Sequence, residues 1–170
     1  MTSLRRLTSE DLPRLRQFWV EHWGDEIMIT RGNIYRPEQL EGFVIENGSE
    51  WVGLLTFIVK DHECEVTSLD SLREGQGIGT KLIDAVVEEA RRQICKRLFL
   101  ITTNDNMRAL RFYQKRRFEL VAVHRGAVNE SRKLKPSIPL TGMDGIPLRD
   151  EIELELSLRG EVQPQRGNLK

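Results

Sequence analysis

The stretch that decides the fold reads Leu69-Asp70-Ser71-Leu72-Arg73-Glu74-Gly75-Gln76-Gly77-Ile78-Gly79-Thr80-Lys81-Leu82. It begins as an extended apolar strand, passes through a short turn with three alternating glycines, and continues as a helix. Glycine has no Cβ, so a ligand can approach its backbone closely and a positive φ costs little. The first N–H groups of a helix have no partner inside the helix, and the helix dipole adds positive potential there. The stretch therefore predicts a cradle for a pyrophosphate group.

The size and composition are those of an ordinary globular protein. The 170 residues, 39% of them hydrophobic and 31% charged, suffice for one domain with a sizeable core, which we expect over residues 1–160, with 161–170 as a flexible tail. The formal net charge is zero, from 26 basic and 26 acidic residues. This balance argues against a general nucleic-acid binder. The basic residues between 91 and 117 either form a solvated face or flank an anionic cofactor.

The cysteines and the N-terminus indicate where the protein works. Cys64 and Cys95 have neither metal-site nor redox-motif spacing, and such a pair suits a reducing compartment. No apolar signal core and no stretch long enough to span a membrane is present in the sequence. We expect a soluble cytoplasmic protein without membrane or metal partners.

Apolar periodicity predicts seven strands and three main helices. The helices are expected from about 9 to 23, 77 to 92 and 105 to 116, with a short helix at 37–41. Asn47-Gly48 predicts a hairpin turn, and the strand at 97–103 follows a helix, so it can lie parallel to the strand before it. Segments 24–36 and 124–151 are expected to be irregular. The strands are expected at 3–7, 43–46, 51–59, 62–69, 97–103, 118–123 and 152–158.

Three phosphate-binding motifs compete for the glycine-rich turn. A P-loop needs Gly-Lys-Ser/Thr, but here Gly79 is followed by Thr80-Lys81. A dinucleotide fingerprint has the spacing G-x-G-x-x-G, whereas this turn reads G-x-G-x-G. The segment 74–79 resembles the coenzyme A turn of the GNAT acetyltransferase superfamily, [Arg/Gln]-x-x-Gly-x-[Gly/Ala], at five of six positions. Residues 104–113 with Phe118 resemble the Asn-x-x-Ala…Tyr…Gly-Phe segment of the same family.

The resemblance covers nearly the whole chain and implies the acyl-CoA N-acyltransferase fold, an α/β (α+β type) protein. That fold has a mixed, twisted seven-stranded sheet with helices on both faces. It also implies transfer of an acetyl group from acetyl-CoA to an amine, without a metal. Two residues depart from the family pattern: Glu74 replaces Arg or Gln, with Arg73 as a neighbour that could compensate, and Arg117 replaces a glycine.

The resemblance also implies roles for individual residues. Tyr113 matches a tyrosine that acts as general acid, its alternative being a core aromatic. Asn104 and Asn106 are candidates for contacts to the pantetheine arm, and helix capping is a second role for Asn106. The strand residue Leu69 is implied to pair with the acyl or pantetheine arm through its backbone. The other implied cofactor contacts are Asp70, Ser71, Leu72, Glu74, Gly75, Gln76, Gly77, Ile78, Gly79, Thr80, Ala109 and Phe112.

The general base is expected on the strand before the turn. Glu63 and Glu65 precede Leu69, and even spacing predicts that they lie on its face; the resemblance places a glutamate base at 63 in some members. Solvated edge charges are the alternative, and His62 and Asp70 are weaker candidates.

The acceptor is expected near the segment between residues 23 and 35, with Trp23, Glu26, Arg31 and Tyr35 as candidate contacts; rim packing is the alternative. The 126–150 segment forms either a second wall or a homodimer contact. The acceptor is a small-molecule or peptide amine. A non-catalytic acyl-CoA-binding module and a nucleotide-binding regulatory domain are the competing functions.

Overall fold

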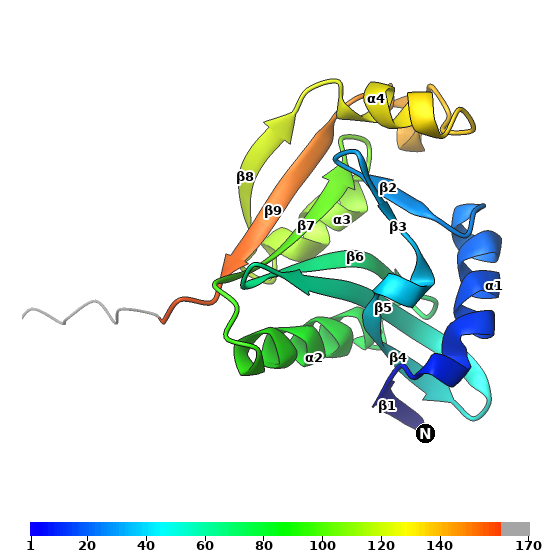
Figure 1. Ribbon diagram of the computed structural model, residues 1–170, viewed down its shortest axis with the longest axis vertical. Helices are drawn as coiled ribbons and strands as arrows, with labels where there is room; N and C mark the ends of the chain where they lie inside the picture. The colour runs from blue at the N-terminus through cyan, green and yellow to red at the C-terminus, as the bar shows by residue number, and fades with distance from the viewer. Residues whose placement is uncertain (161–170) are drawn as a thin grey trace, which may run out of the picture.

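The computed structural model describes residues 1–160, and the predicted tail at 161–170 lies outside the described residues. Its centre is one seven-stranded sheet in the order β1-β4-β5-β6-β7-β9-β8 (Figure 1). Only β6 and β7 pair in parallel in the described part, so the sheet is mixed, as predicted. The strands are β1 (Thr2–Arg6), β4 (Glu41–Asn47), β5 (Glu50–Lys60), β6 (Glu63–Ser71), β7 (Arg97–Thr103), β8 (Glu119–His124) and β9 (Glu151–Ser157).

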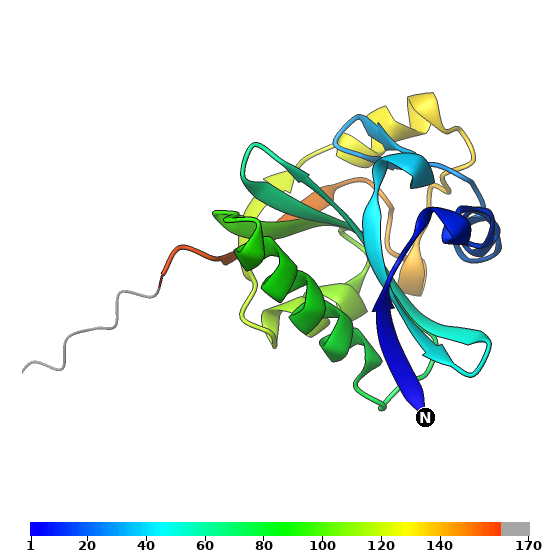
Figure 2. The ribbon, with the colours of Figure 1, turned by 60° about the horizontal axis from the view of Figure 1, so that its bottom comes forward.

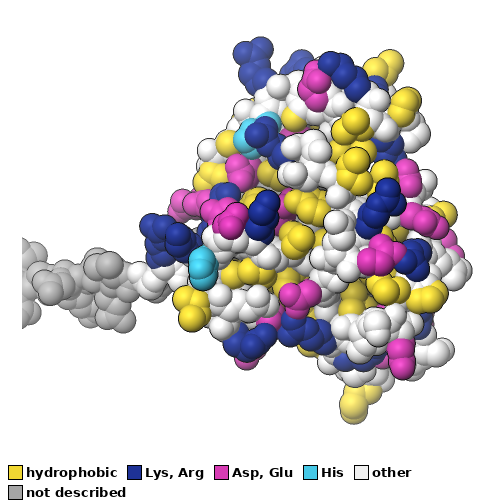
Figure 3. Space-filling model, viewed as in Figure 1, with side chains coloured by type: hydrophobic (Ala, Val, Ile, Leu, Met, Phe, Trp, Pro, Cys, Tyr) yellow, Lys and Arg dark blue, Asp and Glu magenta, His cyan; other side chains and the backbone are white. Residues whose placement is uncertain are grey.

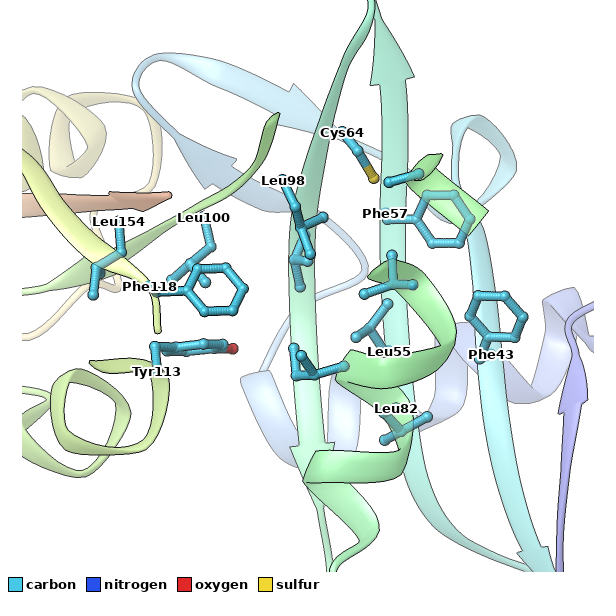
Figure 4. Close-up of a cluster of buried hydrophobic side chains, with 14 of the residues drawn as sticks. Phe43, Leu55, Phe57, Cys64, Leu82, Leu98, Leu100, Tyr113, Phe118 and Leu154 are labelled. Atoms are coloured by element: carbon cyan, nitrogen blue, oxygen red, sulfur yellow. The ribbon is translucent and has the colours of Figure 1, made fainter. Parts of the chain in front are cut away.

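Helices cover both faces of the sheet. Figure 2 shows α1 (Leu12–Trp23) on one side and α2 (Ile78–Arg92) along the other. The helix α1 packs its Leu15, Phe18 and Trp19 against Val44, Trp51 and Leu54 of the sheet. The helices α2 and α3 (Met107–Gln114) cover the larger cluster on the opposite face. Figure 4 shows part of that larger cluster, whose members include Phe43, Leu55, Phe57, Cys64, Leu82, Leu98, Leu100, Tyr113, Phe118 and Leu154.

Local sequence explains where the helices begin and end. Gly24 ends α1 in the left-handed conformation at φ 78°, which glycine adopts without a Cβ clash. The side chain of Asn106 accepts the Ala109 N–H and so caps α3. Leu82, Val86 and Ala90 recur every four residues and are all buried, so α2 is held by its apolar face.

A bulge in β6 changes which side chains face which core. Phe57 opposes Val66 and Thr56 opposes Ser68, so Thr67 is an extra residue in β6. The hydroxyl of Thr56 lies 2.8 Å from that of Thr67 and 2.5 Å from that of Ser68. These hydroxyl contacts fix the bulge at the middle of the sheet.

The parallel pairing of β6 with β7 ends at the same level. The ladder runs from Glu63–Arg97 to Val66–Leu100 and stops there, although both strands continue. The two strands therefore diverge beyond Val66, and the space between them that Thr67 and residues 101–103 line is called the cleft below.

Three local predictions were wrong. The segment 24–36 is not irregular, because β2 (Met28–Thr30) and β3 (Asn33–Tyr35) form a ribbon around Arg31-Gly32, both at positive φ. The hairpin turn after β4 is Gly48-Ser49, one residue later than predicted. The long segment before β9 contains α4 (Ala127–Leu134) and a 3₁₀ turn at Met143–Gly145.

The remaining elements agree with their predictions within a few residues. Short 3₁₀ turns at Ser9–Asp11 and Pro37–Gln39 stand before α1 and β4. Within residues 1–160, none of the helices combines the length and the apolar character needed to cross a bilayer.

Candidate active site

The glycine-rich turn presents a row of backbone N–H groups. Gly75 and Gly77 have φ of 72° and 68°, and a Cβ on either would meet no heavy atom within 4 Å. Among the described residues, no protein acceptor takes the N–H of any residue from Gly75 to Thr80; the next one, of Lys81, donates to the Gly77 carbonyl. Free amides at the start of α2, with open space above the glycines, fit a pyrophosphate.

The charges around this turn differ from the predicted arrangement. Arg73 does not balance Glu74, because its guanidinium lies 2.6 Å from the carboxylate of Glu50. Glu74 instead forms an ion pair with Arg108, at the start of α3. Arg116 adds positive charge beside the turn, since its Nη2 donates to the Thr80 hydroxyl at 2.6 Å. Two members of the basic run at 91–117, Arg108 and Arg116, thus flank the turn, and their flanking of an anionic cofactor stays a prediction.

Tyr113 lies in the larger core cluster and is almost fully buried. Its ring packs edge-on against Phe112 and Phe118, and Figure 4 shows its hydroxyl directed toward β6. No protein hydrogen bond to that hydroxyl is found in the described part of the chain. Burial, with the Asp70 carboxylate nearby, raises the pKa of the phenol. Tyr113 therefore keeps its proton and has no protein partner for it.

The two predicted bases do not share the face of Leu69. Leu69 packs against the α2 side of the sheet. The extra residue Thr67 reverses the alternation, so Glu63 and Glu65 lie on the other face. Glu63 is bound to Arg97 at 3.0 Å.

Glu65 is buried and fastens the β2–β3 ribbon to the sheet. It accepts the Tyr35 hydroxyl at 2.6 Å and the Thr30 hydroxyl at 3.3 Å. Burial raises its pKa, and these hydrogen bonds partly oppose the rise. Tyr35, predicted as an acceptor contact, therefore donates its hydroxyl proton to a hydrogen bond with Glu65.

Asp70 lies beyond the bulge, opposite Leu54 and hence on the α1 side. Its carboxylate accepts the Trp23 indole N–H at 3.2 Å. Burial raises the pKa of Asp70 to about 6, and the Trp23 hydrogen bond and His22 oppose the rise. A carboxyl group that titrates near neutral pH thus lies at the cleft.

The asparagines after β7 have structural partners. Asn104 donates to the Pro147 carbonyl and accepts the N–H groups of Arg149 and Asp150, so it ties the 126–150 segment to the sheet. Asn106 caps α3 and lines the cavity described next. Ala109 and Phe112 pack against the larger core, with Phe112 close to Gly79. Their cofactor contacts, like those of residues 69–80, stay predictions.

A cavity of about 350 Å³ lies where the cleft begins. Thr67 of the bulge and residues 101–103 of β7 line it on one side, and α4 lines it on another. The 126–150 segment is thus a wall of this cavity, and its predicted role as a wall of the acceptor site stays a prediction. Figure 3 shows apolar side chains gathered between α4, the β2–β3 ribbon and β7.

The predicted acceptor residues are distributed unevenly around this cavity. Trp23 lines it, whereas Glu26, Arg31 and Tyr35 do not. Arg31 contributes through its backbone, whose N–H donates to Glu151 at 3.0 Å.

Glu151 is a cavity residue that the sequence reading did not select. It is buried, and burial raises its pKa against the effect of the Arg31 N–H. Its second carboxylate oxygen has no hydrogen-bond partner in residues 1–160. Glu151 alternates with the apolar residues of β9, so it lies on the face opposite to Leu154, and that pattern alone does not mark it as a cavity residue. The sequence reading missed Glu151 because the 126–150 segment, which lines the same cavity, was expected to be irregular.

The described residues contain no group of three or more His, Cys, Asp and Glu side chains arranged to hold a metal ion. Both cysteines are buried free thiols.

Relatives from Bacillus subtilis resemble the chain over most of its length. The uncharacterized protein YdhI is 45% identical over 139 residues, which is 81% of this chain and 87% of that protein. The uncharacterized protein YxbD is 42% identical over 143 residues, covering 84% and 90%.

Solved structures share the fold at low sequence identity. A GNAT family acetyltransferase from Elizabethkingia anophelis with acetyl-CoA bound has a TM-score of 0.69 at 19% identity, covering 92% of this chain and 98% of that one. An acetyltransferase from Bacillus subtilis in complex with CoA has a TM-score of 0.65 at 19% identity, covering 93% and 98%. The sequence profile of the acetyltransferase (GNAT) family matches residues 2–118. The chain therefore belongs to the acetyltransferase (GNAT) family.

Proposed function

We propose that this protein transfers the acetyl group of acetyl-CoA to the primary amine of an acceptor held in the cavity, by direct transfer in a ternary complex. One observation carries the proposal. The free amides of Gly75–Thr80 stand at the end of the strand whose bulge residue, Thr67, lines the cavity. A diphosphate bound at the turn and an acceptor bound in the cavity are thus joined by the cleft between β6 and β7.

Bound acetyl-CoA supplies an activated acetyl thioester. The residues of the turn would hold its diphosphate by their backbone N–H groups, with Arg116 and Arg108 balancing charge beside them. The Tyr113 hydroxyl holds a proton at the cleft for the departing thiolate, because burial keeps the phenol protonated.

The acceptor amine must lose a proton to become a nucleophile. We assign this proton to Glu151, which lines the cavity and has one carboxylate oxygen free of protein partners in residues 1–160. Glu65 stays a second candidate, acting through Thr30, which lines the cavity and donates to it. Glu63 is the weakest of the three, because Arg97 holds it.

We propose that the enzyme works in the cytoplasm. Cys64 and Cys95 are free thiols, which suits a reducing compartment.

Gly77→Ala tests the proposal, with Gly48→Ala as its control. Both glycines have positive φ, 68° and 63°, and open space at the Cβ position. Each variant should lose about 1 kcal/mol of stability from the left-handed backbone. Only Gly77→Ala places a methyl group where the diphosphate would lie. We expect its affinity for acetyl-CoA, measured by calorimetry, to fall at least about tenfold.

Equal affinities in the two variants would refute the assigned turn. The non-catalytic alternative makes a different prediction, namely tight acetyl-CoA binding without thiol release in the presence of any amine. A nucleotide-binding domain would be stabilised by ATP or NAD and not by acetyl-CoA.

A further inference from the structure

Ser131 has a buried hydroxyl without a partner. The residue is 3% exposed, and its Oγ makes no hydrogen bond within residues 1–160. Burying a hydroxyl without a partner costs free energy, and most buried hydroxyls are satisfied. Ser131 lies on α4 and lines the cavity. The hydroxyl itself is covered, so a molecule bound in the cavity reaches it once the Ser131 side chain rotates toward the cavity, and the contact then satisfies it.

Lys135 extends the polar surface of Ser131. It is the residue directly after α4, and both residues line the cavity. The Lys135 side chain is mostly buried, and its ammonium group lies 3.5 Å from the carboxylate of Asp25, which leaves further N–H groups for a ligand. Arg132, between them in sequence, is committed elsewhere, since it donates to the carbonyls of Ile138, Pro139 and Leu148. Ser131 and Lys135 together can bind a carboxylate, one oxygen to each.

On its sheet side the cavity has a negatively charged residue, Glu151, opposite in charge to Lys135. Glu151 belongs to β9 and keeps one carboxylate oxygen free, as described above. Asp105 is already used, because its oxygens accept the Thr103 hydroxyl and the Met143 N–H. Between these polar groups the lining is largely apolar, from Trp23, Ile27, Met28, Ile101, Val128, Ile138, Met143 and Leu148.

The walls limit the size of the acceptor. Arg132 fastens α4 to the chain after it, and Asn104 fastens residues 147–150 to the end of β7. Both ends of the 126–150 segment are thus held over a space of about 350 Å³, which suits a small molecule better than an extended peptide.

We propose that the acceptor is a small amino acid with an apolar side chain. Its carboxylate binds Ser131 and Lys135, its side chain fills the apolar middle, and its ammonium group faces Glu151. This inference rests on the proposed function for the chemistry and adds the class of acceptor.

Matched pairs of amines test the class. L-Leucine and 3-methylbutylamine share a side chain, as do L-phenylalanine and 2-phenylethylamine, but only the amino acids carry a carboxylate. In the presence of CoA, we expect calorimetric affinities at least tenfold higher for the amino acid of each pair. In assays of thiol release from acetyl-CoA, the amino acid of each pair should likewise have the lower KM. A leucyl tripeptide should bind no better than the bare amines.

Ser131→Ala and Lys135→Met test the two contacts. Each should weaken amino-acid binding at least fivefold and leave the bare amines unchanged. Ser131→Ala should be at least as stable to urea as the parent protein, because it removes an unsatisfied buried hydroxyl. Lys133→Met is the control on the same helix, since Lys133 is exposed and pairs with Glu130.

The outcomes separate this inference from the proposed function. If bare amines or the tripeptide are acetylated as well as the amino acids, the acceptor class is wrong and the enzyme assignment stands. Amino-acid binding that both variants weaken, without thiol release, would support the pocket and overturn the enzyme assignment. Binding that neither variant changes would overturn the pocket assignment.

Discussion

Replacing Asp70 with Asn should change how the stability of the protein depends on pH. Burial at the cleft raises the pKa of Asp70 to about 6 from an ordinary 3.8. The folded protein therefore binds this proton more tightly than the unfolded chain does. The parent protein must lose stability as pH rises through the window between about 4 and 6. Asn carries no titrating group, and it can still accept the Trp23 indole N–H, so the variant lacks this loss.

The size of the effect follows from the two pKa values. A difference of about two units corresponds to about 3 kcal/mol, since each unit is about 1.4 kcal/mol. Asp70 is only half-buried, so solvent screening reduces the effect to about 1–3 kcal/mol. The stability of Asp70→Asn relative to the parent should rise by this amount from pH 4 to pH 7.5.

Urea unfolding followed by tryptophan fluorescence at pH 4, 5, 6 and 7.5 measures this difference. Asp11→Asn is a control that should show no pH trend over this range, because the ion pair with Arg5 lowers the pKa of Asp11 to about 2. The stabilising charge of Asp11 is present above pH 4 and is lost only as pH falls toward 2, so the variant should be destabilised by nearly the same amount at all four pH values. A flat difference for Asp70→Asn between pH 4 and 7.5 would show that its carboxyl group is not desolvated.

Three further changes have defined outcomes. Tyr113→Phe should lower kcat at least tenfold and leave the acetyl-CoA affinity unchanged. It should also abolish the alkaline limb of the pH–rate profile, which lies at higher pH than for an ordinary tyrosine because burial raises the pKa of the phenol. Unchanged turnover would show that Tyr113 is not the acid. Arg117→Gly should stabilise the fold by about 1 kcal/mol, because Arg117 has a φ of 68°, and raise Tm by about 2–4 °C; a lower Tm in calorimetry would contradict this. Comparing Glu151→Gln, Glu65→Gln and Glu63→Gln should show the largest loss of kcat and of the acidic limb in Glu151→Gln; if Glu63→Gln loses most, the assignment of the base is wrong.

The elements with strong periodicity could be predicted because their local and tertiary signals agree. The helix α2 has its apolar residues every three to four positions, and all of its face is buried against the sheet. The strand β7 was predicted with its correct bounds, since its β-formers are buried and flanked by breaks. The glycine-rich turn lies where its sequence placed it, and Gly75 and Gly77 take positive φ there, whereas Gly79 does not.

The errors occurred where the chain adopts conformations that its residues disfavour. Arg31 takes a positive φ in the β2–β3 turn, which no propensity rule favours, so the ribbon was missed. The helix α4 has only three apolar residues, Ala127, Val128 and Leu134, and these do not show a helical period. Glu151 was missed for the same reason, because the segment that buries it was expected to be a loop.

The prediction that Glu63 and Glu65 share the face of Leu69 was wrong because Thr67 of β6 has no partner residue in β5. A bulge leaves no trace in an alternating pattern of apolar residues, and here the pattern continues on both sides of Thr67. The bulge is seen only when the residues of β6 are paired with those of β5.

That extra residue could be removed without turning the strand over. Without Thr67, Val66 would still oppose Phe57 and Ser68 would still oppose Thr56, so Leu69 and Asp70 would keep their sides of the sheet. A deletion would instead remove the Thr67 hydroxyl beside Thr56 and one part of the cavity wall. A chain shortened by this one residue should therefore still fold, and its loss should fall on the cavity.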